Sequence, residues 1–293
     1  MKDFFRKHSA LLIVIMALMA LASNLVTGFL QERYASNLTE FYVIEAVCKY
    51  VIAALVFVLM LRWGYVKRAK LKNVLFGFLL GLPFALFVIE NLLPITLVQS
   101  GQMKVYWSVV ISIVLAKTAV GMMEELGVRG VLLPLLCEKW KGKQRCYMKS
   151  AVASSLLFGC MHFSWSIREI LTSGSVTLPH FLENLNQVFF TFCFGMLAAG
   201  ITLYVGSVLP VMIWHSLTSI SAFLDRGLMH STTYSYYYKN NLLTMQNVFE
   251  KYGILPGIEH GYLICSMVVN ILVLFVGIVL VQKAERKCMD MSN

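Results

Sequence analysis

The sequence predicts an all-α fold, a polytopic membrane helical bundle with about eight transmembrane helices. The first observation is composition: 58% of the 293 residues are hydrophobic and 14% are charged, whereas a soluble domain has about 45–50% apolar and about 25% charged residues. The second is that apolar runs of the ~20 residues needed to cross a bilayer recur along the chain. Because no long polar stretch separates them, we treat residues 1–293 as a single membrane domain.

The apolar runs follow one another from end to end. The predicted spans lie near residues 9–30, 41–61, 73–98, 105–136, 150–167, 185–206, 208–225 and 261–282. The first run follows a basic N-terminus, as in a signal peptide, but it is long and no clear small-residue cleavage site follows it. We therefore keep it as the first span.

Basic residues between the runs predict the orientation. With eight spans, sixteen of the 25 Lys and Arg residues fall on the side that holds both termini, and six fall on the other side. Since cytoplasmic loops are enriched in Lys and Arg, both termini should be cytoplasmic in a multi-pass protein of the cell membrane. Orientation accounts for the net charge of +10, so nucleic acid is not an expected partner.

Three ionisable residues, Glu124, Glu125 and Arg129, lie close together within the fourth run. A charge at the centre of a membrane helix costs about 2.5–3.5 kcal/mol on insertion scales, so such residues indicate function. Glu125 and Arg129 are four residues apart and can pair on one helical face. Glu124 is rotated by about 100° from Glu125 and can face another group.

Two histidines belong to later runs. His162 ends the segment Phe158-Gly-Cys-Met-His162, and His215 begins the segment His215-Ser-Leu-Thr-Ser219. At ~1.5 Å of rise per residue, Glu124, His162 and His215 lie roughly 21, 18 and 13 Å from the cytoplasmic ends of their runs. A carboxylate and two imidazoles at one depth suit general-base catalysis and oxyanion stabilisation, which peptide hydrolysis requires.

Each of these residues also has a purely structural interpretation. Glu125 and Arg129 could form only a structural ion pair, and a lone intramembrane histidine is often an interhelical hydrogen-bonding group. Lys117 lies two turns before Glu124, so it could either join the site or snorkel to the membrane surface, and we expect the second. Lys49 is expected to form interfacial or interhelical contacts.

The ordered motifs resemble a known family. Glu124-Glu125-Leu-Gly-Val-Arg129, Phe158-Gly-Cys-Met-His162 and His215 ahead of a small polar residue are similar to the three motifs of the CPBP (CAAX protease and bacteriocin-processing) family. This group of intramembrane proteases includes the type II CAAX prenyl endopeptidases and bacterial Abi proteins. The resemblance covers about residues 105–225, the expected catalytic core.

The resemblance implies a catalytic set and a role for each member. Glu124 would activate water together with His162, Glu125 and Arg129 would hold the site, and His215 would help to form the oxyanion hole. The sequence departs from the family at Ser219, where Asn or Asp is usual. A serine hydroxyl reaches less far, and losing one oxyanion donor can cost about 10²–10³ in rate. The catalytic candidates are Glu124, Glu125, Arg129, His162, His215 and Ser219.

The family has been described both as metalloproteases and as glutamate proteases. The HExxH motif of many zinc hydrolases is absent, although His162, His215 and Glu124 would supply a donor set that zinc accepts. We favour a metal-free mechanism without a cofactor, and zinc is the alternative.

The predicted function is intramembrane cleavage of a membrane-associated or lipidated peptide or protein, in peptide maturation or bacteriocin self-immunity. The expected partners are a peptide or membrane-protein substrate and membrane lipid, and the sequence does not fix the oligomeric state. One alternative is a proton-coupled transporter, against which the lack of internal repeats argues. Another is a catalytically inactive membrane scaffold of the same fold, which Ser219 favours.

Overall fold

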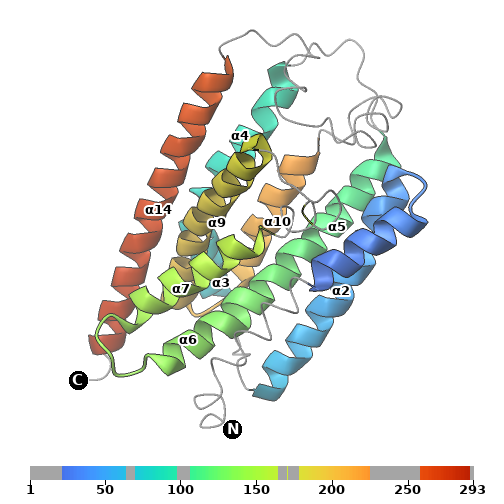
Figure 1. Ribbon diagram of the computed structural model, residues 1–293. Coiled ribbons are helices and arrows are strands. Elements are labelled where there is room, and N and C mark those ends of the chain that lie inside the picture. The colour runs from blue at the N-terminus through green and yellow to red at the C-terminus, as the bar shows by residue number, and fades with distance from the viewer. Residues whose placement is uncertain are drawn as a thin grey trace.

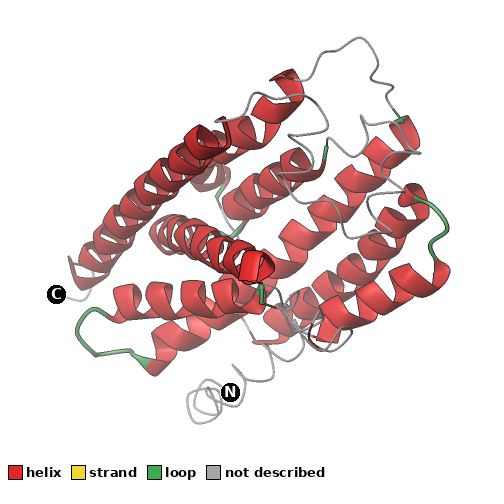
Figure 2. Ribbon diagram, turned by 45° about the horizontal axis from the view of Figure 1, so that its top comes forward, coloured by secondary structure: helices red, strands yellow, loops and turns green. Residues whose placement is uncertain are grey.

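Every secondary-structure element that the computed structural model describes is a helix (Figures 1 and 2). The described residues are 22–63, 70–97, 106–163, 170, 178–224 and 258–290. The helices are α2 (Leu38–Trp63), α3 (Leu71–Leu80), α4 (Phe84–Leu97), α5 (Trp107–Glu125), the π-helix η2 (Leu126–Leu132), α6 (Leu133–Lys139), α7 (Cys146–Met161), α9 (Leu178–Val205), α10 (Leu209–Phe223) and α14 (Ile258–Asp290). A further helical segment covers residues 22–34. The all-α prediction is confirmed for these parts of the chain.

Three of the described helical stretches are long and apolar enough to cross a membrane: Leu38–Arg62, Leu185–Val205 and Met267–Asp290. The count of about eight spans, the orientation of the termini and the single-domain organisation stay predictions. Residues 1–21, which include the beginning of the first predicted span, lie outside the described residues.

The third apolar run forms two helices instead of one. α3 ends at Leu80 and α4 begins at Phe84, with Pro83 at the junction, where its fixed φ and missing N–H interrupt helical hydrogen bonding. Trp214 of α10 packs into this junction: its Nε1 donates to the carbonyl oxygen of Phe78 at 2.9 Å. Its ring stacks on Phe78 at 4.8 Å between centroids. A Cβ on Gly81 would collide with the same indole.

The fourth run stays continuous but changes its helical geometry. α5 ends at Glu125, η2 occupies Leu126–Leu132, and α6 continues to Lys139. π-turns inside α-helices are rare and frequently mark functional sites. Here the π-helix begins directly after the two adjacent glutamates.

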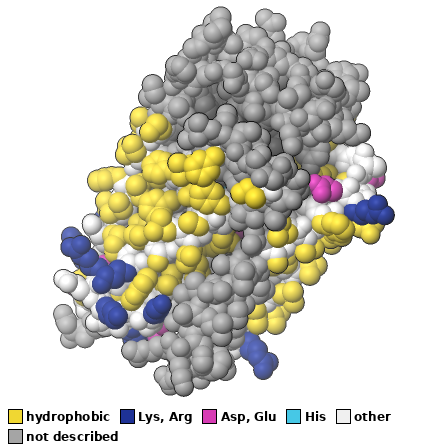
Figure 3. Space-filling view, in the orientation of Figure 1, with side chains coloured by type: hydrophobic (Ala, Val, Ile, Leu, Met, Phe, Trp, Pro, Cys, Tyr) yellow, Lys and Arg dark blue, Asp and Glu magenta, His cyan; other side chains and the backbone are white. Residues whose placement is uncertain are grey.

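The helices that carry the candidate residues pack against one another. α5 lies between α2 and α10, and α9 packs against both α7 and α14 (Figure 1). Phe84, Phe158, Phe194 and Trp214 belong to one buried cluster that joins α4, α7, α9 and α10. In Figure 3, hydrophobic side chains cover much of the described part of the visible face, while Lys and Arg lie mainly toward its lower end and right margin.

Candidate active site

The Glu125–Arg129 ion pair is the most deeply buried part of the site. Arg129 Nη1 donates to Glu125 Oε1 at 3.0 Å, and both side chains are fully inaccessible to solvent. The pairing follows the four-residue spacing, as predicted. On its other side the guanidinium lies over the ring of Phe158, with 4.4 Å between Arg129 Cζ and the ring centroid. The ion pair thereby connects the α5–η2 junction to α7.

His215 of α10 lies between the two glutamates. Its Nδ1 is 2.8 Å from Glu125 Oε1, and its Nε2 is 3.6 Å from Glu124 Oε2. When Nδ1 carries a proton it donates to Glu125, and a protonated imidazole donates from both nitrogens. The ring packs against Phe194, with 4.9 Å between centroids. These contacts fix both the position and the orientation of the imidazole.

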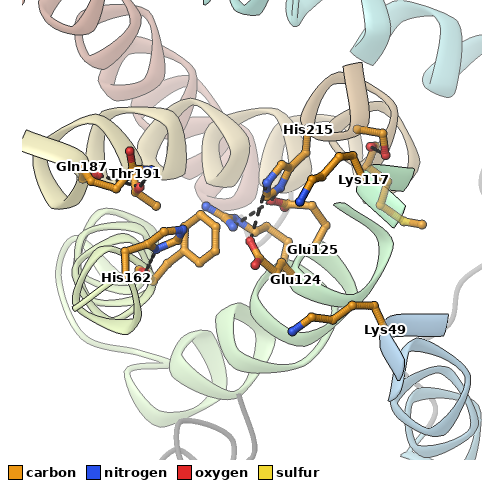
Figure 4. A network of polar contacts seen from close by, with 12 residues as sticks. Lys49, Lys117, Glu124, Glu125, His162, Gln187, Thr191 and His215 are labelled. Atoms are coloured by element: carbon orange, nitrogen blue, oxygen red, sulfur yellow. Dashed lines mark hydrogen bonds and ion pairs between the residues drawn. The ribbon is translucent and has the colours of Figure 1, made fainter. Parts of the chain in front are cut away.

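The two glutamates differ in accessibility. The side chain of Glu125 has no exposed surface, whereas that of Glu124 keeps 14% of its surface exposed. Figure 4 shows both carboxylates on the same side of the bundle as His215. Glu124 is therefore the more accessible of the two carboxylates.

His162 follows α7 and lies apart from this group. Its Nδ1 is 3.0 Å from the carbonyl oxygen of Phe158, and its ring meets the Phe158 ring edge-on at 5.2 Å. Within the described chain it makes no hydrogen bond or ion pair with Glu124, Glu125 or His215, and Figure 4 shows it nearer to Gln187 and Thr191. The depth count thus places Glu124 and His215 together, but His162 is not in contact with them.

Ser219 lies one helical turn after His215 on α10 and is partly exposed. The described part of the chain offers its hydroxyl no hydrogen-bonding partner. A neighbouring contact braces this turn: Asn91 of α4 donates to the Thr218 carbonyl oxygen at 3.3 Å and to Ser221 Oγ at 3.1 Å.

The zinc alternative requires three donors around one point. Among the described residues, no group of three His, Cys, Asp or Glu side chains is arranged to hold a metal ion. His162, His215 and Glu124 are all among these residues. Their arrangement therefore does not fit a zinc site built from this donor set.

The expectation that Lys117 snorkels is wrong. Its side chain is 7% exposed, and its Nζ lies 3.0 and 2.9 Å from the two carboxylate oxygens of Glu45 on α2. The ammonium also lies 3.9 Å from the ring centroid of Phe223. A carboxylate on the neighbouring helix and an aromatic face are stronger attractions than the distant membrane surface.

The sequence analysis missed Glu45, whereas the interhelical contacts expected of Lys49 are confirmed. Lys49 is 3% exposed, and its Nζ donates to Ser23 Oγ at 2.9 Å and to Asn24 Oδ1 at 2.5 Å. Figure 4 shows Lys49 extending from α2 toward the side of the site where Glu124 lies. The available indication was that Glu45 and Lys49 are four residues apart in an otherwise apolar run.

Gly195 of α9 provides space for the buried arginine. A Cβ at this position would lie 2.9 Å from Arg129 Nη2 and 2.9 Å from both Cβ and Oγ of Ser155. Arg129 Nη2 and Ser155 Oγ are buried, and neither has a hydrogen-bonding partner among the residues that the structure describes. The absence of a side chain at residue 195 therefore allows α7, α9 and the guanidinium to meet.

The residues of this site lie in a segment, residues 106–221, that matches a family model described as type II CAAX prenyl endopeptidase Rce1-like. The family resemblance predicted from the motifs is confirmed over this segment. No curated protein and no solved structure matches the chain.

The Rce1-like segment contains Glu124, Glu125, Arg129, His162, His215 and Ser219. The family implies protease activity in general. Together with the three long apolar helices, it indicates a membrane protein. Glu45 and Lys49 lie outside the matched segment, as does the helical segment 22–34.

Proposed function

We propose that this protein is an intramembrane endopeptidase that uses Glu124 to activate water. The observation that supports the proposal is the position of His215 between the fully buried carboxylate of Glu125 and the partly exposed carboxylate of Glu124. Such an arrangement separates a positioning carboxylate, Glu125, from a reactive one, Glu124.

The reaction follows from the roles of these groups. Glu124 accepts a proton from a water molecule as the water oxygen attacks the carbonyl carbon of the peptide bond. The carbonyl oxygen becomes an oxyanion, which an N–H of His215 stabilises. As the C–N bond breaks, Glu124 returns the proton to the leaving amine, and the products are a carboxylic acid and an amine.

Glu125 is not suited to be the base. Its Oε1 contacts both Arg129 and His215, and its side chain is inaccessible. Because the guanidinium fixes the position of this carboxylate, Glu125 holds the imidazole toward Glu124. The ion pair thus positions His215 and takes no proton itself.

His162 and Ser219 complete the proposal from the open side of the site. The contact between His162 Nδ1 and the Phe158 carbonyl oxygen orients the ring, and its Nε2 would bind the attacking water, as the family resemblance implies. The Ser219 hydroxyl would donate a second hydrogen bond to the oxyanion.

The substrate class is a membrane-associated or lipidated peptide or protein. The family description names CAAX prenyl endopeptidases, so a peptide with a prenylated cysteine near its C-terminus is the first substrate to test. A leader peptide of a secreted bacterial peptide is the second.

The test is incubation of the purified protein in lipid vesicles with each peptide, followed by mass spectrometry of the products. We expect cleavage by the natural protein, loss of cleavage in Glu124→Gln, and cleavage that persists when a chelator is present. Cleavage that is unchanged in Glu124→Gln would contradict the assignment. Loss of cleavage on chelation alone would replace the metal-free mechanism.

A catalytically inactive scaffold is the second candidate, because Ser219 lacks the reach of Asn and no described residue forms a hydrogen bond with its hydroxyl. The variant Ser219→Asn separates the two. An enzyme limited by a weak oxyanion donor should gain about 10-fold or more in kcat. An inactive scaffold would stay inactive in both forms.

A further inference from the structure

Apart from Glu40 and Arg62 in the terminal turns of α2, the charged residues of α2, α5 and η2 balance one another. Three are acidic and three are basic: Glu45, Glu124, Glu125, Lys49, Lys117 and Arg129. Two direct ion pairs account for four of them, Glu45 with Lys117 and Glu125 with Arg129. The remaining carboxylate is Glu124 and the remaining ammonium is Lys49.

The position of Lys49 is fixed by hydrogen bonds. Ser23 and Asn24 of the helical segment 22–34 accept from its Nζ. Ser23 Oγ also lies 3.7 Å from the sulfur of Met123, the residue before Glu124. The ammonium is therefore held near α5, and Figure 4 shows Lys49 extending toward the side of the site where Glu124 lies.

The charges of Lys49 and Glu124 attract each other without direct contact. No direct ion pair joins the two side chains, because the Nζ of Lys49 is held by Ser23 and Asn24. A direct ion pair would occupy the carboxylate oxygen that must take a proton from water. Held in this way, the ammonium acts on the anion through space and leaves the carboxylate oxygen free.

We propose that Lys49 is a positioning residue for the reaction, a fixed positive charge on the side of the site where the Glu124 carboxylate lies, which offsets the charge of that carboxylate without pairing with it. This inference depends on the proposed role of Glu124. An isolated carboxylate in a low-dielectric interior is costly, and Arg129 is already paired with Glu125. Lys49 and its two hydrogen-bonding partners lie outside the matched segment, so residues 22–63 contribute to the chemistry of the Rce1-like core.

The first measurement is cleavage kinetics of Lys49→Met and Lys49→Arg in lipid vesicles. Methionine keeps an unbranched side chain but removes the charge, and we expect kcat to fall about 10-fold or more while KM changes less than about threefold. Arginine keeps the charge and should retain kcat within about threefold. Equal loss in both variants would assign Lys49 a packing role and overturn the proposal, as would an unchanged kcat in Lys49→Met.

If Lys49→Met does not accumulate in the membrane, a second variant that keeps the lysine can test the same proposal. Asn24→Ala removes one acceptor of the ammonium and leaves Lys49 in place. We expect kcat to fall by about threefold or more, because the ammonium is then less well oriented. An unchanged kcat in this variant would also overturn the proposal.

The second measurement does not need activity. Thermal unfolding of Lys49→Met, Glu124→Gln and the double variant forms a double-mutant cycle. Coupled charges predict that the Tm of the double variant falls less than the sum of the two single losses, by about 2 °C or more. Additive losses would overturn the proposal. If no peptide is cleaved by the natural protein, the proposed function fails, and this cycle still decides whether Lys49 and Glu124 interact.

Discussion

Replacement of Gly195 by alanine tests whether the space around Arg129 matters for stability and catalysis. The new Cβ would lie 2.9 Å from Arg129 Nη2 and 2.9 Å from Ser155 Cβ. Rotation of a side chain cannot relieve the second contact, because Ser155 Cβ is fixed to the α7 backbone. The guanidinium has little freedom either, since it is held by Glu125 at 3.0 Å and covered by Phe158.

The expected magnitude is a difference of two effects. Overpacking of a buried site costs about 1–3 kcal/mol, and alanine regains about 1 kcal/mol of helix propensity relative to glycine. The net loss is therefore about 0–2 kcal/mol, or up to about 8 °C in Tm for a domain of this size. Displacement of Arg129 should reduce kcat by about 10–100-fold, which is more than the loss of stability alone would produce.

The assays are thermal unfolding in detergent and peptide cleavage in vesicles. Ser155→Gly provides the matched variant, because it removes both the Cβ and the Oγ that the new methyl group meets. When it is added to Gly195→Ala, it should restore part of the Tm that Gly195→Ala loses. Ser155→Gly alone is the reference for this comparison. An unchanged or raised Tm with unchanged cleavage in Gly195→Ala would refute the role assigned to this glycine.

Three further substitutions test the buried charges. Arg129→Met leaves the Glu125 carboxylate buried without its cation, so we expect a loss of about 3–5 kcal/mol in the free energy of unfolding, measured by denaturant titration. Addition of Glu125→Gln should recover part of that loss, and a further loss would contradict the pairing. Lys117→Met should destabilise the protein by a similar mechanism, because it leaves Glu45 without its cation. If the pair holds α2 and α5 together, adding Glu45→Gln should restore part of the Tm. Phe158→Leu removes the aromatic face under the guanidinium and should cost about 1–2 kcal/mol, whereas no change in stability would show that the stacking contributes little.

Contacts that depend on helical spacing were the ones predicted most accurately from the sequence. Glu125 and Arg129 belong to one continuous run, so a four-residue interval was enough to predict their contact. His215 and Glu124 come from different helices, and a simple count of helical rise placed both at one depth. Each of these predictions requires only the geometry of a straight helix.

Other predictions failed where packing between helices decides. A depth count cannot give the rotation of a helix about its axis, so the role predicted for His162, whose hydrogen bond in the described chain goes to the carbonyl oxygen of Phe158, stays a prediction. Lys117 was expected at the membrane surface because Glu45 belongs to another run, and nothing in the local sequence brings the two together. The break at Pro83 divided a run whose uniform apolar character predicted one long helix.

The π-helix η2 also sets the direction in which the chain continues from α5 into α6. On one side of it, Glu124 and Glu125 face α10, and on the other side Leu133 packs with Ala151 of α7. The wider turn contains one residue more than a regular α-helix would need, so it sets the angle between the two halves of one continuous helix. Deletion of one residue within Leu126–Leu132 would restore regular helix and rotate α6 by about 100° relative to α5. The number of residues between the glutamates and Leu133 therefore sets which face of α6 meets α7 while the glutamates face α10.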